Sequence, residues 1–179
     1  RSSAASDVYK RQALARLHEG PLPGSAGLAA VAAAAEAQTA LRAGDPGHAR
    51  AVLRAHAEPG SAHGEPGTGG GELALARAAL LLAEGDFRAA RAAAAACLDG
   101  ASARTRHERA RALLAAAVAA RRLGEVAGAA AQISEALGLA EPQGDYRVFL
   151  DGGLAVRSAV TVLVPPTSRY AGFVSRILE

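Results

Sequence analysis

Apolar residues recur at intervals of three and four along most of the chain, which is the spacing of one face of an α-helix. The clearest stripe lies in residues 103–123, and it consists of Ala110, Leu113, Leu114, Ala117 and Val118. A similar stripe in residues 126–140 consists of Ala129, Ile133, Ala136, Leu137 and Ala140. Glycine and proline interrupt the pattern between such segments. The pattern therefore predicts a series of helices separated by turns.

The segments predicted to be helical are residues 28–43, 47–57, 72–84, 86–98, 103–123, 126–140, 153–164 and 169–178. A Gly/Pro-rich loop is predicted at residues 58–71. Residues 72–84 are apolar on nearly every side, so we expect this helix to lie deep between its neighbours. The β-branched run at residues 160–164 also fits a strand, but helix is preferred because no partner strand can be identified.

Composition favours the same fold class. Half of the residues are hydrophobic, most of these are alanine, and only 3% of the chain is aromatic. Alanine is the strongest helix former and a poor strand former. The sequence therefore predicts an all-α fold in which small side chains let helices pack closely. Its 179 residues have room for one domain or one compact set of repeats.

Charge and cysteine content exclude several classes of protein. The net charge is only +3, so the charge balance does not indicate a basic face for nucleic acid. Cys97 is the only cysteine, which excludes an internal disulfide and a zinc site built on paired cysteines. No apolar run approaches the roughly 20 residues of a membrane span, and no secretory signal is present. We therefore expect a cytoplasmic protein without membrane contact.

The two ends of the chain are expected to differ from its middle. Residues 1–12 contain the only lysine and resemble a cloning junction, so we expect them not to be native. Residues 13–27 are predicted to be a linker, and residues 28–144 a helical-repeat domain. Residues 145–179 are predicted to be a helical extension that leads to a further domain. The heavy use of Ala, Arg, Gly and Pro suggests a GC-rich bacterial genome.

One turn pattern occurs three times: a glycine, an acidic residue, and an alanine five positions after the glycine. The three units are Gly44-Asp45 with Ala49, Gly85-Asp86 with Ala90, and Gly124-Glu125 with Ala129. Glycine ends a helix because it accepts the left-handed conformation cheaply. The acidic side chain can then accept amide protons at the start of the next helix, where the helix dipole is positive. We therefore expect antiparallel helix pairs that must pack on one another to bury their apolar faces.

Residues 85–90, which read GDFRAA, resemble the inter-helix turn of tetratricopeptide repeats. Cys97 and Ala136 match a later small position of that family, and Pro142 resembles its closing proline. The period departs from the family, since the glycines are 41 and 39 residues apart rather than about 34. The resemblance implies a right-handed α-solenoid whose concave surface, formed mainly by the first helix of each pair, is the binding face.

Longer repeats of this kind are typical of the helical region of MalT-like regulators of the LuxR family. The stretch at residues 136–153 resembles the “GYxRxFLDEG” element of those proteins, and the matching residues are Gly144, Tyr146, Arg147, Phe149, Leu150, Asp151 and Gly152, with Gly153 in place of the acidic residue. The resemblance implies a sensing or protein-interaction arm that lies between an ATPase domain and a helix-turn-helix domain. Such an arm would bind a protein partner or a small inducer on its concave face, and it would reach DNA only through a domain that this chain lacks. A freestanding tetratricopeptide-like scaffold is the alternative.

The arginines of residues 103–123 are the only candidate partner-binding residues, and we select Arg104, Arg111 and Arg122. A solvated face, or a surface for an acidic partner, accounts for them better than nucleic-acid binding, because no recognition motif or stacking aromatic accompanies them.

No catalytic, metal or cofactor site is predicted. The glycine-rich run at residues 64–71 lacks the Gly-Lys-Ser/Thr end of a phosphate loop and is better explained as a linker. His48, His56 and His63 are too scattered for one metal ion. His107-Glu108 lacks the second histidine of the metalloprotease signature, because position 111 is arginine. Cys97 fits a buried packing position better than a nucleophile. We therefore expect a protein that is not an enzyme.

Overall fold

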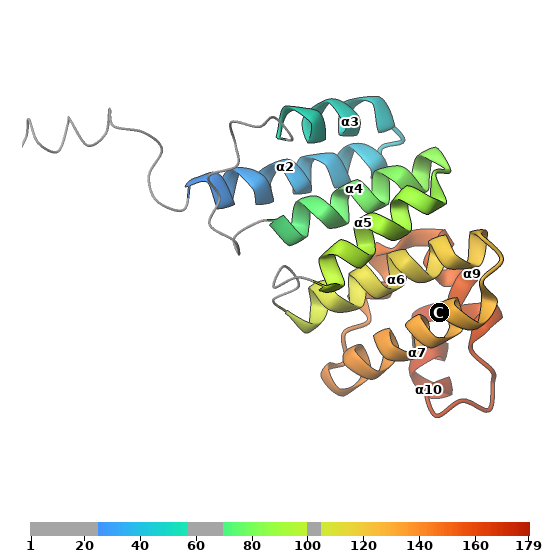
Figure 1. Cartoon of the computed structure of the whole chain (residues 1–179). Coiled ribbons are helices and arrows are strands. Elements are labelled where there is room, and N and C mark those ends of the chain that lie inside the picture. Colours follow the sequence, from blue (N-terminus) through green and yellow to red (C-terminus); the bar gives the residue numbers. More distant parts are fainter. Residues whose placement is uncertain (1–24, 57–69, 100–104) are drawn as a thin grey trace, which may run out of the picture.

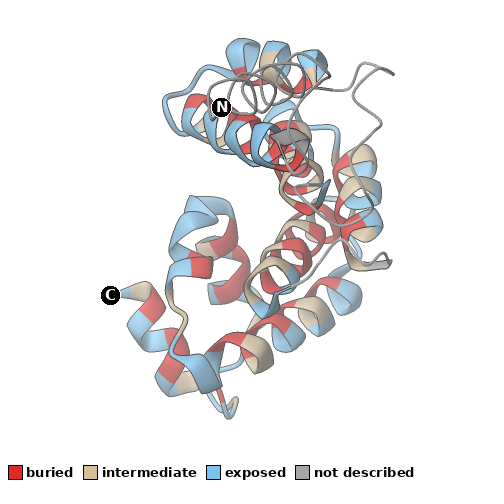
Figure 2. Ribbon diagram, turned by 90° about the vertical axis from the view of Figure 1, so that its left-hand side faces the viewer, coloured by how far each residue is buried: buried red, intermediate tan, exposed pale blue. Residues whose placement is uncertain are grey.

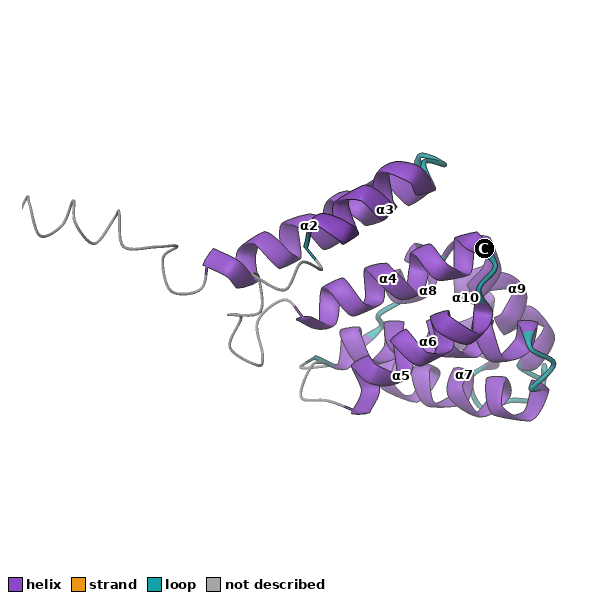
Figure 3. Cartoon of the chain, turned by 45° about the horizontal axis from the view of Figure 1, so that its top comes forward, coloured by secondary structure: helices purple, strands orange, loops and turns teal. Residues whose placement is uncertain are grey.

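The computed structural model describes residues 25–56, 70–99 and 105–179, and these ranges contain helices but no strand (Figure 3). The helices are α2 (Ser25–Arg42), α3 (Pro46–Ala55), α4 (Gly70–Glu84), α5 (Phe87–Asp99), α6 (Arg106–Arg122), α7 (Val126–Ala140), the 3₁₀ turn η1 (Glu141–Gln143), α8 (Arg147–Asp151), α9 (Gly153–Leu163) and α10 (Ala171–Leu178). The predicted all-α class is confirmed for this part of the chain. None of the helices in these ranges is both long enough and apolar enough to cross a membrane.

Several helix starts differ from the sequence prediction. Helix α2 begins at Ser25, inside the segment predicted to be a linker, and α4 begins at Gly70, inside the predicted loop 58–71. Glycine is tolerated there because the cost of its conformational freedom is largest in the interior of a helix. Helix α6 was predicted to start at residue 103, but its cap is Thr105. The Thr105 Oγ1 accepts from the Glu108 N–H (3.0 Å), and the Glu108 carboxylate accepts from the Thr105 N–H (2.9 Å).

The C-terminal region is helical, including the β-branched segment for which a strand was the alternative. Helix α9 continues to Leu163, and only Val164 has an extended backbone, immediately before two prolines. The last helix begins at Ala171 rather than at residue 169. The short helix α8 and the turn η1 were not predicted, because neither is long enough to show a helical period.

The three predicted glycine corners lie between consecutive helices and share one geometry. Gly44, Gly85 and Gly124 have φ angles of 79°, 82° and 84°. At the last of them, the Gly124 N–H donates to Arg121 O (3.1 Å) and the Glu125 N–H to Ala120 O (2.9 Å), and the other two corners repeat this pair of bonds. These two bonds define the Schellman motif, which satisfies carbonyls at the end of a helix.

The acidic residues after these glycines do not all act as expected. Asp45 and Asp86 each accept a hydrogen bond from a backbone N–H three residues later, at 2.9 and 3.0 Å. Glu125 makes no such cap, so that expectation was wrong. Its longer side chain instead pairs with Arg91 of α5. The alanines five positions after each glycine (Ala49, Ala90 and Ala129) are fully buried, as their small size requires where two helices approach closely.

A fourth corner of the same type, which the repeat pattern did not include, lies at Gly144-Asp145. Gly144 has a φ of 62°, its N–H donates to Glu141 O, and the Asp145 N–H donates to Ala140 O. It follows Gly124 by only 20 residues, and the residue five positions later is Phe149 rather than alanine. The corner therefore turns the chain out of the regular pairs and into the C-terminal helices.

The helices lie side by side in a curved row, with α3 at one end and α10 at the other (Figure 1). Consecutive helices pack against each other, and the first helices of the pairs also pack together, α2 against α4 and α4 against α6. Helix α4 contacts α2, α3, α5 and α6, in agreement with the prediction that it lies deep between its neighbours. Helices α8 and α9 pack on α6, so the end of the chain turns back toward the first helices (Figure 2).

The core changes in character along this row. Between α2 and α5 most fully buried side chains are alanines, with Leu53, Leu75 and Leu80 as the larger members. The main cluster joins α6 and α7 to the C-terminal helices, and its largest buried side chains include Phe149, Ile133, Leu137 and Ile177. Residues 145–179 therefore share one core with the last regular helix pair.

Candidate ligand-binding groove

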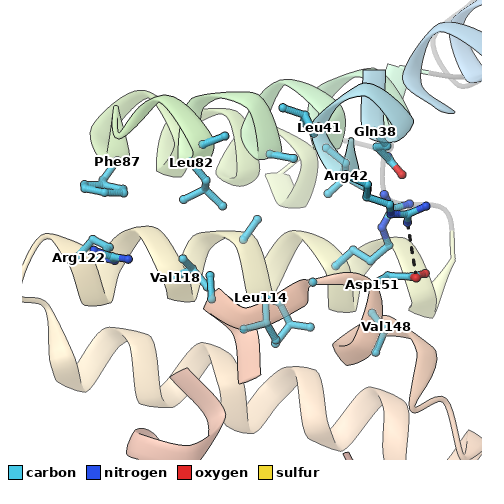
Figure 4. A pocket seen from close by; sticks show the side chains of 18 residues that line it. Gln38, Leu41, Arg42, Leu82, Phe87, Leu114, Val118, Arg122, Val148 and Asp151 are labelled. Carbon is cyan, nitrogen blue, oxygen red and sulfur yellow. Dashed lines mark ion pairs between the residues drawn. The ribbon is translucent and has the colours of Figure 1, made fainter. Parts of the chain in front are cut away.

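A cavity of about 350 Å³ opens on the inner side of the curved row of helices. Its walls come from α2, α4, the start of α5, α6, α8 and α9, and the lining residues shown in Figure 4 are Gln38, Leu41, Arg42, Leu75, Ala79, Leu82, Ala83, Phe87, Arg111, Leu114, Ala115, Val118, Arg122, Val148, Asp151, Gly152, Ala155 and Val156. We refer to it as the groove. Its volume lies at the small end of the usual range for small-molecule sites.

Small and branched apolar side chains form the centre of the groove. Leu82 of α4 faces Leu114 and Val118 of α6 across it (Figure 4). The alanines of both helices leave this space open, because a larger residue at their positions would fill it. Helix α6 repeats every 3.6 residues, so Leu114 and Val118 present adjacent turns of one face to the groove.

At one end of the groove, an ion pair joins two parts of the chain that are distant in sequence. Arg42 at the end of α2 pairs with Asp151 at the end of α8, with 3.5 Å between nitrogen and oxygen (Figure 4). Asp151 also receives Arg147 at 3.6 Å. The Arg42 side chain is well exposed, so this contact contributes little to stability. It does mark the place where α2 and α8 approach each other across the opening.

Two further arginines line the groove from α6. The Arg111 Nη1 lies 2.9 Å from both carboxylate oxygens of Glu72, and both side chains are about four-fifths buried. Arg122, at the other end of the helix, places its guanidinium over the ring of Phe87, 5.6 Å from the ring centre. Among the described residues no carboxylate pairs with Arg122.

The structure gives different surroundings to the three arginines selected from the sequence. Arg111 and Arg122 line the groove, and Arg104 lies outside the described residues. Two other arginines of α6 point elsewhere: Arg109 pairs with Glu135 of α7 at 2.8 Å, and Arg121 approaches Ser158 of α9 at 3.4 Å. The helix therefore has no single basic face, which is unfavourable for nucleic-acid binding through it.

The first helices α2, α4 and α6 form one wall, on the side that the sequence predicted to be concave. The opposite wall, which α8 and α9 form, was not predicted from the sequence. Its contributors Val148, Asp151 and Val156 follow the fourth corner, and the pair Gly144-Asp145 was the signal that could have placed them there.

Several residues of the element at 144–153 have clear structural roles. Phe149 is fully buried and meets Phe173 edge-on at 5.9 Å, while Tyr146 stacks on the same ring at 4.5 Å. Asp151 makes the ion pairs at the groove. Gly153 has a φ of 64°, a conformation that an acidic residue would adopt only with strain. The backbone conformation therefore explains why position 153 is glycine rather than an acidic residue.

Cys97 is fully buried between α4 and α6, with Leu75 and Ala112 as neighbours. Burial raises the pKa of its thiol above the ordinary value of 9.0, and the negative charges of Glu108 and Glu72 act in the same direction. The thiol therefore stays protonated near neutral pH. This environment is that of a packing cysteine rather than of a nucleophile.

The described histidines each approach a different polar group. The His48 imidazole lies 2.8 Å from Glu36, and the His56 Nδ1 lies 3.1 Å from Val52 O. His63 lies outside the described residues. His107 Nδ1 lies 2.7 Å from an Asp145 oxygen, which ties the start of α6 to the fourth corner. Within the described ranges no three His, Cys, Asp or Glu side chains gather as a metal site would require.

Comparisons of this chain with protein-family models, with curated proteins and with solved structures gave no match.

Proposed function

We propose that this chain is the sensing or protein-interaction arm of a bacterial LuxR-type transcriptional regulator, with a tetratricopeptide-like stack of helix pairs that binds its ligand in the groove. In this proposal the chain has no catalytic activity of its own and contacts DNA only through another domain. The repeated Schellman corners and the packing of α2, α4 and α6 against one another support the stack. The element at residues 144–153 supports the regulator family.

The main observation in support of the proposal is that the groove is formed by helices from distant parts of the chain. Its walls come from three successive helix pairs and from the C-terminal helices. Arg42 and Asp151, which form an ion pair at the groove, are more than 100 residues apart in the sequence. A ligand that fills the groove touches all of these helices at once. Such a ligand favours one relative placement of the helices, which is the physical requirement for a sensor. A groove formed by a single helix pair would lack this property.

The parent gene provides the first test. The regulator proposal expects its open reading frame to encode a helix-turn-helix domain, and an open reading frame without one leaves the freestanding scaffold as the better explanation.

A reporter assay with the full-length protein provides the second test. Ala115→Leu places a larger side chain in the groove, while Ala96→Leu adds the same atoms at an exposed position of α5. We expect Ala115→Leu to change the promoter response to its signal and Ala96→Leu to leave it unchanged. Equal responses of both variants and the wild type would exclude the groove as the sensing site, provided that circular dichroism shows both to be folded.

A further inference from the structure

The wall that α6 contributes to the groove is basic at both ends and apolar in the middle. Arg111 and Arg122 are eleven residues apart, close to three complete turns, so they lie on the same side of the helix about 16 Å from each other. Leu114, Ala115 and Val118 line the groove between them. An occupant that lies along α6 therefore meets apolar surface over its length and a guanidinium at each end.

The two guanidiniums differ in whether their N–H groups are already paired with a carboxylate. Arg111 already pairs with both oxygens of Glu72, and Arg42 at the end of α2 shares Asp151 with Arg147. Among the described residues, the contact of Arg122 is with the ring of Phe87, whose centre lies 5.6 Å from the guanidinium carbon. Arg122 donates no hydrogen bond to another described residue, so the N–H groups of its guanidinium are available to an occupant of the groove.

The charges around the groove are also unequal. The charged residues that line it are Arg42, Arg111, Arg122 and Asp151, and Glu72 pairs with Arg111. These three arginines and two carboxylates leave a net charge of +1, and among the described residues Arg122 is the arginine without a carboxylate partner. An anion bound at this end would complete the pairing, whereas a cation would meet repulsion.

We propose that the groove binds a small amphipathic acid, with its carboxylate on Arg122 and its apolar body along Leu114 and Val118. This proposal rests on the proposed function of the groove as the ligand site. The cavity of about 350 Å³ accommodates a small molecule rather than a folded partner. The cation–π contact with Phe87 favours a position of Arg122 beside the groove before the ligand arrives, which reduces the ordering cost of binding.

Three probes of equal chain length separate the contributions of head group and body: decanoate and decylamine, each below its critical micelle concentration, and decanol below its solubility limit in water. Binding to the whole chain is measured by isothermal titration calorimetry at pH 7.5. We expect decanoate to bind roughly tenfold more tightly than decanol, a factor that corresponds to about 1.4 kcal/mol, and decylamine to bind most weakly.

Two variants test the role of Arg122. Arg122→Gln removes the guanidinium at the groove, while Arg121→Gln removes the same charge from the neighbouring residue, which approaches Ser158 and does not line the groove. We expect Arg122→Gln to abolish the preference for decanoate over decanol and Arg121→Gln to retain it. Because both side chains lie at the same end of α6, any effect on the helix dipole or on net charge is matched.

The outcomes separate this proposal from the proposed function. If decanol binds as tightly as decanoate, and Ala115→Leu weakens both, the groove is a binding site but the acid assignment is wrong. If a short apolar peptide with a free C-terminal carboxylate binds and decanoate does not, the assignment to a small amphipathic acid is overturned in favour of a peptide. If no probe binds and Ala115→Leu also leaves the reporter response unchanged, both proposals fail.

Discussion

The left-handed corner at Gly124 gives the sharpest test of the fold, because an identical substitution four residues away should have the opposite effect. Gly124 has a φ of 84°, and a Cβ built on it would meet no heavy atom within 4 Å. Gly128, in the first turn of α7, also has open space around it but no positive φ. Substitution of either glycine by alanine therefore adds one methyl group without a clash, and only the backbone conformation distinguishes the two sites.

The expected magnitudes follow from the backbone. A left-handed conformation costs an L-residue roughly 1–2 kcal/mol. Alanine also restricts the unfolded chain, which offsets about 0.4–1 kcal/mol of that cost. Gly124→Ala should therefore lower the free energy of unfolding by about 1 kcal/mol. Escape to a right-handed conformation is not cheaper, because it would break the bonds from Gly124 N–H to Arg121 O and from Glu125 N–H to Ala120 O. Gly128→Ala should raise stability by about 0.5 kcal/mol, since alanine is the better helix former.

Thermal unfolding followed by circular dichroism at 222 nm measures this difference. For a chain of this size, 1 kcal/mol shifts the melting temperature by roughly 2–4 °C, so the two variants should melt about 3–6 °C apart on opposite sides of the wild type. Gly124→Asn should be less harmful than Gly124→Ala, because asparagine tolerates the left-handed region better. If Gly124→Ala proved as stable as Gly128→Ala, Gly124 would not hold a left-handed corner and the antiparallel pairing would lose its basis.

Two further predictions concern the core. Phe149→Ala should lower the free energy of unfolding by about 3–5 kcal/mol in urea titrations, because it removes a fully buried ring from the largest cluster. Leu150→Ala, at a half-exposed position, should lower it by less than about 0.5 kcal/mol. Equal losses would contradict the assigned faces of α8. Because the pKa of Cys97 is raised in the fold, folding favours the protonated thiol, so its contribution to stability is complete below about pH 9.0 and declines as pH rises further. The urea midpoint of the wild type should therefore fall more between pH 7.5 and pH 10 than that of Cys97→Ala, and parallel falls would show that the thiol is not linked to folding.

The regular helices were predictable because local chemistry determines them. Helix α7 begins at Val126 and ends at Ala140 as the apolar stripe indicated, and each predicted glycine corner has the expected backbone conformation. These features depend on residues within one turn of each other. A Schellman corner forms from a glycine and the last turn of the preceding helix, so the three corners could be placed from local sequence.

The groove was less predictable because its opposite wall depends on contacts across the fold. The first helices were expected to form a binding face, and they do form one wall, but nothing local in Val148 or Val156 indicates that they lie opposite α4. Their position follows from the fourth corner, whose spacing of 20 residues departs from the repeat. The ion pair between Arg42 and Asp151 is likewise a long-range contact that no spacing rule could have indicated.

The interfaces among helices α2 to α5 consist mainly of alanine, and this limits how this half of the molecule can move. Alanine has no side-chain rotamers to exchange, so rotamer changes in these interfaces are confined to the few larger residues such as Leu53, Leu75 and Leu80. A change in the spacing of these helices therefore requires whole helices to slide or tilt, as in shear motion between packed layers. The cluster around Phe149 contains side chains that can reorient, and it can absorb such a displacement locally.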